Sequence, residues 1–254
     1  MGGAIMGGIF RSGMDISLFA CDTNQERLQE LQSSYGVTPA SSNSTLLTSC
    51  ECVFLVVKPQ SFPDVLEEMR RDIPQEMLIV SIAAGITEHT ISDALGYPAK
   101  VVQVMPNTPL LLGYGASALA KGSQVSEAEF DFVRQIFSCA GIAEEIPAEK
   151  MNEIIAINGS SPAFIYEFTK YFVEYASSNG IDADVALKLF AQSLIGSAKM
   201  LTESGYSVDR LIEMVSSKGG TTIAGLDAFR KKGLGEAVLA GCDACTKRAY
   251  ELAK

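Results

Sequence analysis

The segment of the sequence that most clearly suggests chemistry is 216–225, where two glycines lead into a pair of threonines and then into an apolar helical pattern. Consecutive backbone N–H groups at the start of a helix bind anions, and the helix dipole adds partial positive charge there. The hydroxyls of Thr221 and Thr222 would stand beside these N–H groups and could orient a carboxylate or an amine. A plain helix cap is the alternative, but it does not need Gly-Gly-Thr-Thr together, so we favour a carboxylate site.

Small, polar or rigid residues also follow each of four expected strands in the first half of the chain. These segments are 21–24, 58–60, 83–85 and 106–109. In an open parallel sheet, ligands bind beyond the carboxyl ends of the strands. Any one of the segments is typical of an ordinary turn, but four of them at one edge of a sheet favour a cofactor groove.

The elements that would position these groups fall into two differently built halves. In the first half we expect strands over 16–20, 52–57, 77–82 and 101–105, helices over 24–35, 62–71 and 86–95, and then a strand, a helix and a strand over 116–119, 130–140 and 144–146. Strands that alternate with helices predict parallel strands joined by crossovers, which is a doubly wound α/β domain. This domain would cover residues 1–148.

The second half, 149–254, carries only helical patterns. We expect helices over 154–176, 183–202, 208–215, 220–231 and 234–254. The pair Cys242 and Cys245 falls on the apolar side of the last helix, which favours packing in a core over metal binding. A helical half of this size with several apolar faces is too small for a good core of its own, so we expect at least a dimer.

Composition excludes several classes of protein. The chain has 254 residues, is 47% hydrophobic and carries a net charge of −10, so it lacks the basic face of a nucleic-acid binder. The first 150 residues carry 9 basic and 18 acidic groups and the remainder 11 and 12, so the second half suits an anionic substrate better. The sequence shows no membrane span and no signal peptide, and we expect a cytoplasmic protein whose six cysteines stay reduced.

Six motifs, in order along the chain, resemble those of the pyrroline-5-carboxylate reductase family. They are Lys-Pro-Gln at 58–60, Ser-Ile-Ala-Ala-Gly at 81–85, Met-Pro-Asn-Thr-Pro at 105–109, Gly-Ser-Ser-Pro-Ala-Phe at 159–164, Gly-Ser-Ala-Lys-Met-Leu at 196–201 and Gly-Gly-Thr-Thr-Ile-Ala-Gly at 219–225. The resemblance implies an oxidoreductase that reduces 1-pyrroline-5-carboxylate to L-proline with NAD(P)H, the last step of proline biosynthesis. It also implies a Rossmann-like domain followed by an all-α dimerisation domain, in homodimers that often assemble into decamers.

The same resemblance assigns roles to individual residues. It implies that the cofactor is bound by Asn43, Val56, Val57, Lys58, Pro59, Ala83 and Ala84. To these we add, from their places at a helix start or after a strand, Gly2, Asp22, Asn24 and Asn107. It implies that the substrate is bound by Gly220, Thr221, Thr222, Ser161 and Pro162, to which we add Gly219; we expect Thr222 to form a hydrogen bond with the ring nitrogen as the catalytic residue. A cyclic imine is already electrophilic, so hydride transfer needs positioning rather than a strong protein acid, and we expect no metal.

Three departures from the family pattern stand out. The chain starts within the opening glycine motif of the family, so we expect a Rossmann-like domain without its first strand and without Gly-x-Gly. Lys218 stands where the family usually has proline, and Gln103 stands where it usually has arginine. Asp22 would accept from the ribose 2′-OH of NAD, whereas the family more often uses NADP; we expect NADP from the resemblance and leave NAD open.

Two alternatives remain at this point. One is an enzyme similar to 3-hydroxy-acid dehydrogenases, which would need a catalytic lysine where this chain has Ala163. The other is a non-catalytic dimeric protein, because the glycine-rich loop is missing. Binding of NADPH by the purified protein would separate the second alternative from an enzyme.

Overall fold

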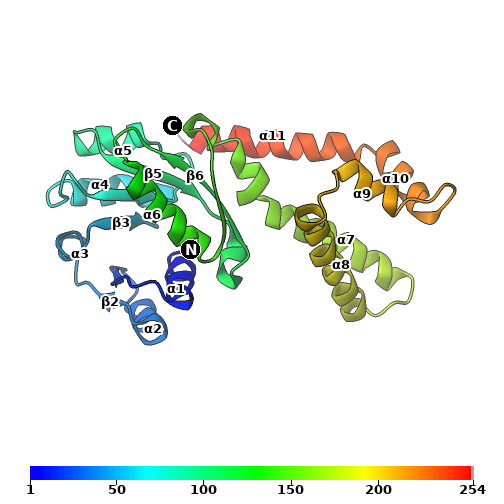
Figure 1. Cartoon of the computed structure of the whole chain (residues 1–254), viewed down its shortest axis with the longest axis horizontal. Helices are drawn as coiled ribbons and strands as arrows, with labels where there is room; N and C mark the ends of the chain where they lie inside the picture. The colour runs from blue at the N-terminus through cyan, green and yellow to red at the C-terminus, as the bar shows by residue number, and fades with distance from the viewer. Residues whose placement is uncertain (253–254) are drawn as a thin grey trace. The chain divides into compact units, whose positions relative to one another are not determined.

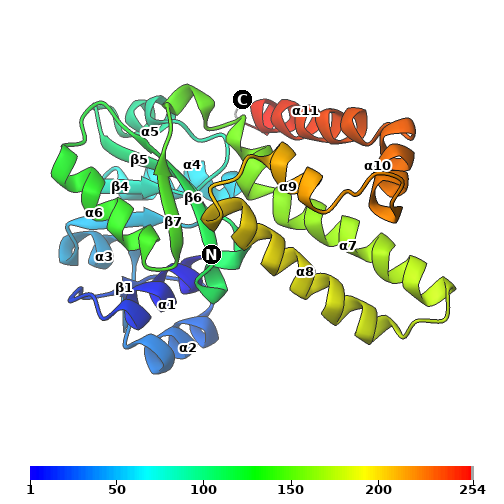
Figure 2. The same cartoon turned by 45° about the vertical axis from the view of Figure 1, so that its right-hand side comes forward.

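The computed structural model describes residues 1–252, the side chain of Pro59 excepted. Contacts divide the chain into two compact units, one formed by Met1–Pro162 with Ala244–Lys254 and the other by Ala163–Asp243 (Figures 1 and 2). The first unit contains every strand, and the second is built from helices. The fold is therefore an α/β domain followed by a helical one, as the sequence predicts.

The first unit is organised around a five-stranded sheet with the order β3-β4-β5-β6-β7. The strands are β3 (Cys52–Leu55), β4 (Leu78–Ser81), β5 (Lys100–Met105), β6 (Gly115–Lys121) and β7 (Gly141–Glu145). Strands β3, β4 and β5 are parallel, as are β6 and β7. Two short parallel strands, β1 (Phe19–Ala20) and β2 (Thr38–Pro39), form a separate sheet.

The prediction of parallel strands throughout is wrong at one place, because β5 and β6 are antiparallel. A parallel neighbour needs a long crossover, usually a helix. Only the short 3₁₀ helix η2 (Thr108–Leu112) separates β5 from β6, so the chain turns back beside the strand that it has just left.

Helices cover both faces of the larger sheet. The helices of the first unit are α1 (Gly2–Ser12), α2 (Gln25–Tyr35), α3 (Asn43–Ser49), α4 (Phe62–Met69), α5 (Glu88–Leu95) and α6 (Glu127–Ser138). Side chains of α1 and α6 pack with Val80 and Val102 on one face, whereas α4 and α5 pack with Ile79 and Val101 on the other. Successive strand residues thus serve opposite layers, which is the pattern of a sheet buried on both sides.

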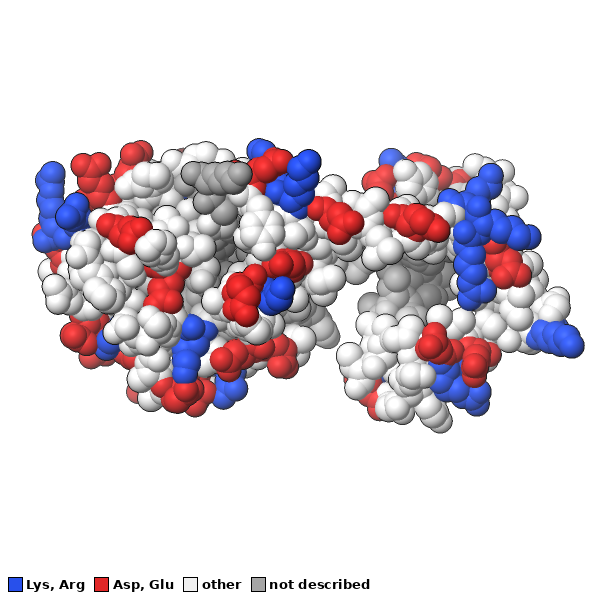
Figure 3. Space-filling view, turned by 90° about the horizontal axis from the view of Figure 1, so that it is seen from above, with Lys and Arg blue, Asp and Glu red and all other residues white. Residues whose placement is uncertain are grey.

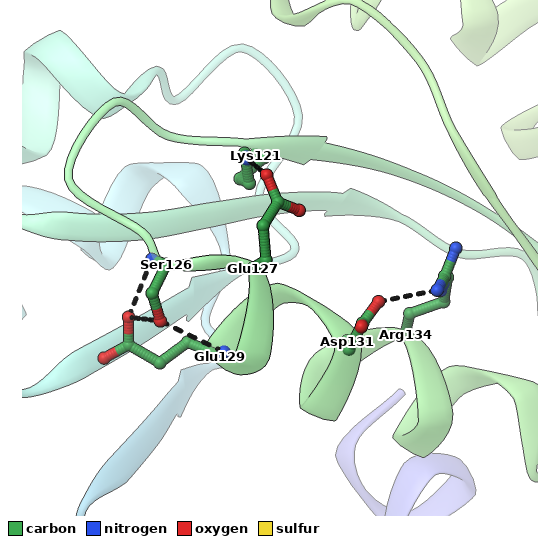
Figure 4. A network of polar contacts seen from close by, with 6 residues as sticks. All are labelled: Lys121, Ser126, Glu127, Glu129, Asp131 and Arg134. Carbon is green, nitrogen blue, oxygen red and sulfur yellow. Dashed lines mark hydrogen bonds and ion pairs between the residues drawn. The ribbon is translucent and has the colours of Figure 1, made fainter.

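Helix α6 begins with a reciprocal cap (Figure 4). Ser126 Oγ accepts from the Glu129 N–H at 3.3 Å, and the Glu129 carboxylate accepts from the Ser126 N–H at 2.8 Å. An ion pair joins Lys121 at the end of β6 to Glu127 of α6, and another joins Asp131 and Arg134 within α6. The cap explains why α6 starts at residue 127, three residues before the predicted start.

The long helix predicted over 154–176 is in fact two elements. A π-helical segment, η4 (Ile155–Gly159), comes first, and the Ser160 N–H donates to the Ile155 carbonyl at 2.8 Å. Helix α7 (Ser161–Ser178) then starts with Pro162 in its first turn. Proline has no N–H and fits the start of a helix, so it marks the break between the two elements.

The second unit has almost no buried core of its own. It contains α8 (Ala183–Glu203), α9 (Val208–Met214), α10 (Thr221–Lys231), most of α7 and the start of α11 (Leu234–Leu252). Aromatic rings join three of these helices, with Phe172 of α7 stacked on Phe190 of α8 at 4.2 Å and Phe168 6.4 Å from Phe229 of α10. Of the described residues between 163 and 243, Ala176 is the one buried hydrophobic residue.

Two further expectations concern the last helix and the surface. Cys242 and Cys245 are half-buried, and Val238 and Leu252 of the same helix are 56% and 42% exposed, so packing of the two cysteines in a core stays a prediction. Acidic side chains lie scattered over the first unit (Figure 3), in line with its excess of acidic residues. Across the part of the chain that the structure describes, no helix is long and apolar enough to cross a membrane.

Candidate cofactor and substrate sites

Three predicted cofactor segments lie beyond the carboxyl ends of parallel strands in the larger sheet. Leu55 at the end of β3 pairs with Ser81 at the end of β4, and Ser81 pairs with Gln103 near the end of β5. Because these strands are parallel, the segments that follow them leave the sheet on the same side. Val56 to Lys58, Ala83 with Ala84, and Asn107 all follow these strands.

The start of α1 faces the end of β3. A Cβ atom on Gly2 would lie 3.6 Å from Val56 Cγ1. The N-cap residue Met1 makes no side-chain capping bond, and the first turn has no acidic residue. Free N–H groups with the positive end of a helix dipole bind phosphate oxygens, so this helix start fits the phosphates of a dinucleotide.

The segment after β4 is held from β5. Gln103 Nε2 donates to the Ile86 carbonyl at 2.9 Å, across the segment that carries Ala83 and Ala84. Ala83 packs on the core beneath α4 and α5. Gln103, for which the sequence motif predicted arginine, therefore holds this segment through a neutral amide.

Carboxylates gather at the end of β1. Asp22 Oδ1 accepts from the Asn24 N–H at 2.9 Å, and Asn24 in turn caps α2. The amide of Asn43 is taken by Glu68, with Nδ2 donating to Oε2 at 2.9 Å. Burial, followed by the charges of Glu68 and Asp22, raises the pKa of the Cys21 thiol. Both carboxylates thus act on the same small region, where an additional negative group of a ligand would be repelled.

Asn107 is buried and its side chain is fully used within the protein. Its Oδ1 accepts from the Ala116 N–H at 2.9 Å, and its Nδ2 donates to the Asn158 carbonyl at 3.2 Å. Asn158 itself donates from Nδ2 to the carbonyls of Met105 and Ala116. Sequence reasoning missed Asn158, although a polar residue directly after the apolar run 154–157 was a usable signal.

The remaining cofactor and substrate residues of the first unit differ in their exposure, and Pro162 is buried. Lys58 is exposed, Val57 is half-buried against the core, and Pro59 begins the 3₁₀ helix η1 (Pro59–Ser61). Ser161 and Pro162 form the first turn of α7. The hydroxyl of the preceding Ser160 lies 3.1 Å from Cys245 Sγ of α11.

The Gly-Gly-Thr-Thr segment starts α10 in the second unit. Gly219 has φ +74°, a conformation that favours glycine, and Gly220 is the N-cap residue. No side chain caps this helix, and Thr221 and Thr222 are exposed in its first turn. The plain Ser or Thr cap that we considered is therefore absent here, and the first N–H groups stay free for an anion.

The described residues contain no group of three or more His, Cys, Asp or Glu side chains that could hold a metal ion. All six cysteines are free thiols. What the arrangement can do is bind an anion at the start of α10 and a phosphate-bearing ligand at the start of α1.

Two family models match the chain. Residues 1–85 match a model described as NADP oxidoreductase coenzyme F420-dependent, and residues 148–252 match one described as pyrroline-5-carboxylate reductase dimerisation. The second match shows that the helical half belongs to a self-associating domain.

Similar proteins cover almost the whole chain. A pyrroline-5-carboxylate reductase of Methanosarcina acetivorans is 33% identical, and one of Escherichia coli is 32% identical, with 100% of this chain and 95% of each relative covered. A crystal structure of Plasmodium falciparum pyrroline carboxylate reductase with NADP bound has a TM-score of 0.90 at 26% identity and covers 100% of this chain and 95% of that one. A Coxiella burnetii pyrroline-5-carboxylate reductase has a TM-score of 0.92 at 28% identity, with 99% and 94% covered.

Proposed function

The chain belongs to the pyrroline-5-carboxylate reductase family, and we propose how its residues carry out the NADPH-dependent reduction of 1-pyrroline-5-carboxylate to L-proline. The observation that carries the proposal is the start of α10, where uncapped N–H groups stand beside two exposed threonine hydroxyls. That chemistry matches a small substrate with one carboxylate and one ring nitrogen. The alternative of a 3-hydroxy-acid dehydrogenase has no catalytic lysine at Ala163 to support it.

For the cofactor, we assign the phosphates to the start of α1, beginning at Gly2. This assignment is supported by the uncapped helix start that faces Val56. Val57, Lys58 and Pro59 after β3, and Ala83 with Ala84 after β4, would line the rest of the groove. Asn107 would support the groove rather than contact the cofactor, because both polar atoms of its side chain already form hydrogen bonds within the protein.

For the substrate, we assign the carboxylate to the N–H groups at Thr221 and Thr222, which follow the N-cap residue Gly220. The dipole of the 11-residue α10 favours negative charge at this end. We assign to Thr222 a hydrogen bond with the ring nitrogen, which becomes the amine of the product. Gly219 sets the turn that leads into this helix, and Ser161 with Pro162 would bind on the nicotinamide side.

The reaction needs orientation more than acid catalysis. Reduced NADP supplies a hydride, which forms a C–H bond at the imine carbon while the C=N π electrons move to nitrogen. A protonated ring nitrogen accepts these electrons without a further proton, so the residues around it need only hold it in place. A threonine hydroxyl that contacts this nitrogen both orients the ring and excludes water.

The family points to NADP, with NAD as the open alternative at Asp22. Asn24 and Arg27 are available near a 2′-phosphate, but Asp22 and Glu68 oppose its charge. We therefore assign NADP as the cofactor. We assign to Asp22 a repulsion of the 2′-phosphate that reduces the preference for NADP over NAD.

The two halves would divide the work, with residues 1–148 binding the dinucleotide and 149–254 serving substrate binding and dimerisation. The nearly core-free second unit supports association of copies through this half. We propose a homodimer that can assemble further, up to a decamer. Six free cysteines support a reducing compartment such as the cytoplasm.

The test is steady-state oxidation of NADPH by the purified protein with pyrroline-5-carboxylate, with proline identified as the product by mass spectrometry. We expect NADPH consumption to equal proline formation. Absence of turnover while the protein binds NADPH would contradict the proposed reaction.

A further inference from the structure

Asn107 and Asn158 are two buried residues of the first unit whose side-chain amides both bond to the backbone of Ala116. Asn158 Nδ2 donates to the Met105 carbonyl at 2.6 Å and to the Ala116 carbonyl at 3.1 Å. Asn107 returns the contact by donating to the Asn158 carbonyl at 3.2 Å while its Oδ1 accepts from the Ala116 N–H at 2.9 Å. The two side chains together satisfy both backbone groups of Ala116.

These bonds join three segments that are far apart in the sequence. Met105 is the last residue of β5, at the edge where the cofactor segments gather. Ala116 is the second residue of β6, which runs beside β5 (Figure 2). Asn158 belongs to the π-helical segment that leads into α7. We call these four hydrogen bonds between the two amides and the backbone the asparagine clamp.

The asparagine clamp holds the π-helical segment η4, whose backbone hydrogen bonds are irregular. Within η4 the Ser160 N–H bonds five residues back, to Ile155. Such π-helical turns are rare and are frequent at functional sites. Asn158 is only 9% exposed, and its Oδ1 has no hydrogen-bond partner. A buried acceptor without a partner costs free energy, so a residue of this kind calls for an explanation.

We propose that Asn158 and Asn107 are positioning residues for the reduction, because their clamp fixes the start of α7 against the carboxyl end of β5. The proposal rests on the proposed function, which places Ser161 and Pro162 on the nicotinamide side of the groove. Residues 159 and 160 are the only ones between the clamp and α7, so a shift at Asn158 moves the first turn directly. A misplacement near 1 Å can cost on the order of 100-fold in rate.

The decisive variant is Asn158→Asp, which keeps the shape but replaces both N–H donors with a carboxylate facing two carbonyls. We expect kcat to fall about 10-fold or more, with the Kd for NADPH within about threefold of the wild type. With NADPH deuterated at the transferred position, the isotope effect on kcat should rise, because hydride transfer becomes slower relative to other steps. Asn179→Asp is the matched control, since Asn179 donates to the Tyr175 carbonyl at the exposed end of α7.

If Asn158→Asp fails to fold, Asn107→Asp takes its place, because it keeps the acceptor for Ala116 and loses only the donor to Asn158. Hydrogen exchange at residues 159–164 gives a readout without substrate, and we expect faster exchange in either variant. A kcat within twofold of the wild type, or a loss of kcat matched by an equal loss of NADPH binding, would overturn the proposal. If the wild type does not reduce pyrroline-5-carboxylate, the proposed function fails, and with it the role in the reduction; faster exchange would then support the clamp alone.

Discussion

Gly220 lies so close to Ser217 that any larger residue at position 220 would force the turn between them to shift. A Cβ atom there would come within 2.5 Å of Ser217 Oγ and 3.0 Å of the Ser217 carbonyl oxygen. The Gly220 N–H also donates to that carbonyl at 2.9 Å, so the two residues form a tight turn in front of α10. Together with the positive φ of Gly219, this turn explains why two successive glycines precede the threonines.

Gly220→Ala should therefore raise the KM for pyrroline-5-carboxylate by about 10-fold or more, because the turn must shift to admit the methyl group. Such a shift displaces the N–H groups that we assign to the carboxylate. Gly225→Ala is the matched control, since nothing lies within 4 Å of a Cβ atom there and alanine favours the helix. Equal KM values for both variants in steady-state kinetics would mean that the turn at Gly220 does not contribute to substrate binding.

Thr222→Ala should lower kcat/KM by roughly 10-fold or more. A hydrogen bond to a charged group contributes about 1.5–3 kcal/mol, which corresponds to this loss. Thr169→Ala serves as the control, because the Thr169 hydroxyl donates to the Ile165 carbonyl on an exposed side of α7. A change smaller than about twofold at Thr222 would remove this residue from the mechanism.

The strands were predictable because their residues are strongly apolar. Central residues of β4 and β5, among them Ile79, Val80 and Val101, are fully buried. Runs of such residues indicate strands buried on both faces. Helix α3 was not predicted, because Ser42 caps a helix of only seven residues with little apolar periodicity. The antiparallel pairing of β5 and β6 could have been predicted, since the expected strands 101–105 and 116–119 are too close in the sequence for the long crossover that a parallel pair needs.

The glycines and threonines of the candidate site were predictable for a different reason. Their types already limit the backbone, as the φ of +74° at Gly219 shows. The asparagine clamp could not be predicted in the same way, because three of its four bonds join residues 42 to 53 positions apart in the sequence. A single polar residue in an apolar run signals a buried contact but does not say with which segment.

Asp22→Asn should shift the cofactor preference toward NADPH. Asparagine keeps the oxygen that accepts from the Asn24 N–H but removes the charge that opposes a 2′-phosphate. We expect the Kd for NADPH to fall by about threefold or more and the Kd for NADH to rise, measured by nucleotide fluorescence. Asp15→Asn, at an exposed position before β1, controls for the loss of one charge. Identical shifts in the two variants would contradict a specific role for Asp22.

The protein should sediment and scatter light as at least a dimer at micromolar concentration. Residues such as Tyr166, Leu189 and Val208 expose 63%, 65% and 60% of their surface, on three helices of a unit that buries almost nothing. A surface of this kind is stable in water when another copy covers it. A mass equal to one chain of 27.1 kDa would contradict association through this unit.

Glu129 ties the start of α6 to β5. Its Oε2 accepts from the Ser126 N–H at 2.8 Å and from Ser126 Oγ at 2.7 Å, and its Oε1 accepts from Lys100 Nζ at 3.0 Å. Burial alone would raise the pKa of this carboxyl, but the hydrogen bonds from Ser126 and the charge of Lys100 outweigh it and lower the pKa from its ordinary value of 4.5. The ionised form is thus favoured in the folded protein over the unfolded chain.

A lowered pKa in the folded state stabilises the protein above pH 4.5, and this contribution is lost as the pH falls through the folded value. Glu129→Gln should therefore lower the free energy of unfolding at neutral pH by about 1–2 kcal/mol, since it weakens the cap and the contact with Lys100. The difference between variant and wild type should shrink as the pH falls from 4.5 through the lowered pKa of the folded protein, because Glu129 is neutral below that value, as glutamine is. Urea unfolding at neutral and acidic pH measures it, with Glu127→Gln as the control, because the Glu127 side chain is 78% exposed. A difference that stays constant across this pH range would mean that the charge of Glu129 is not what stabilises the start of α6.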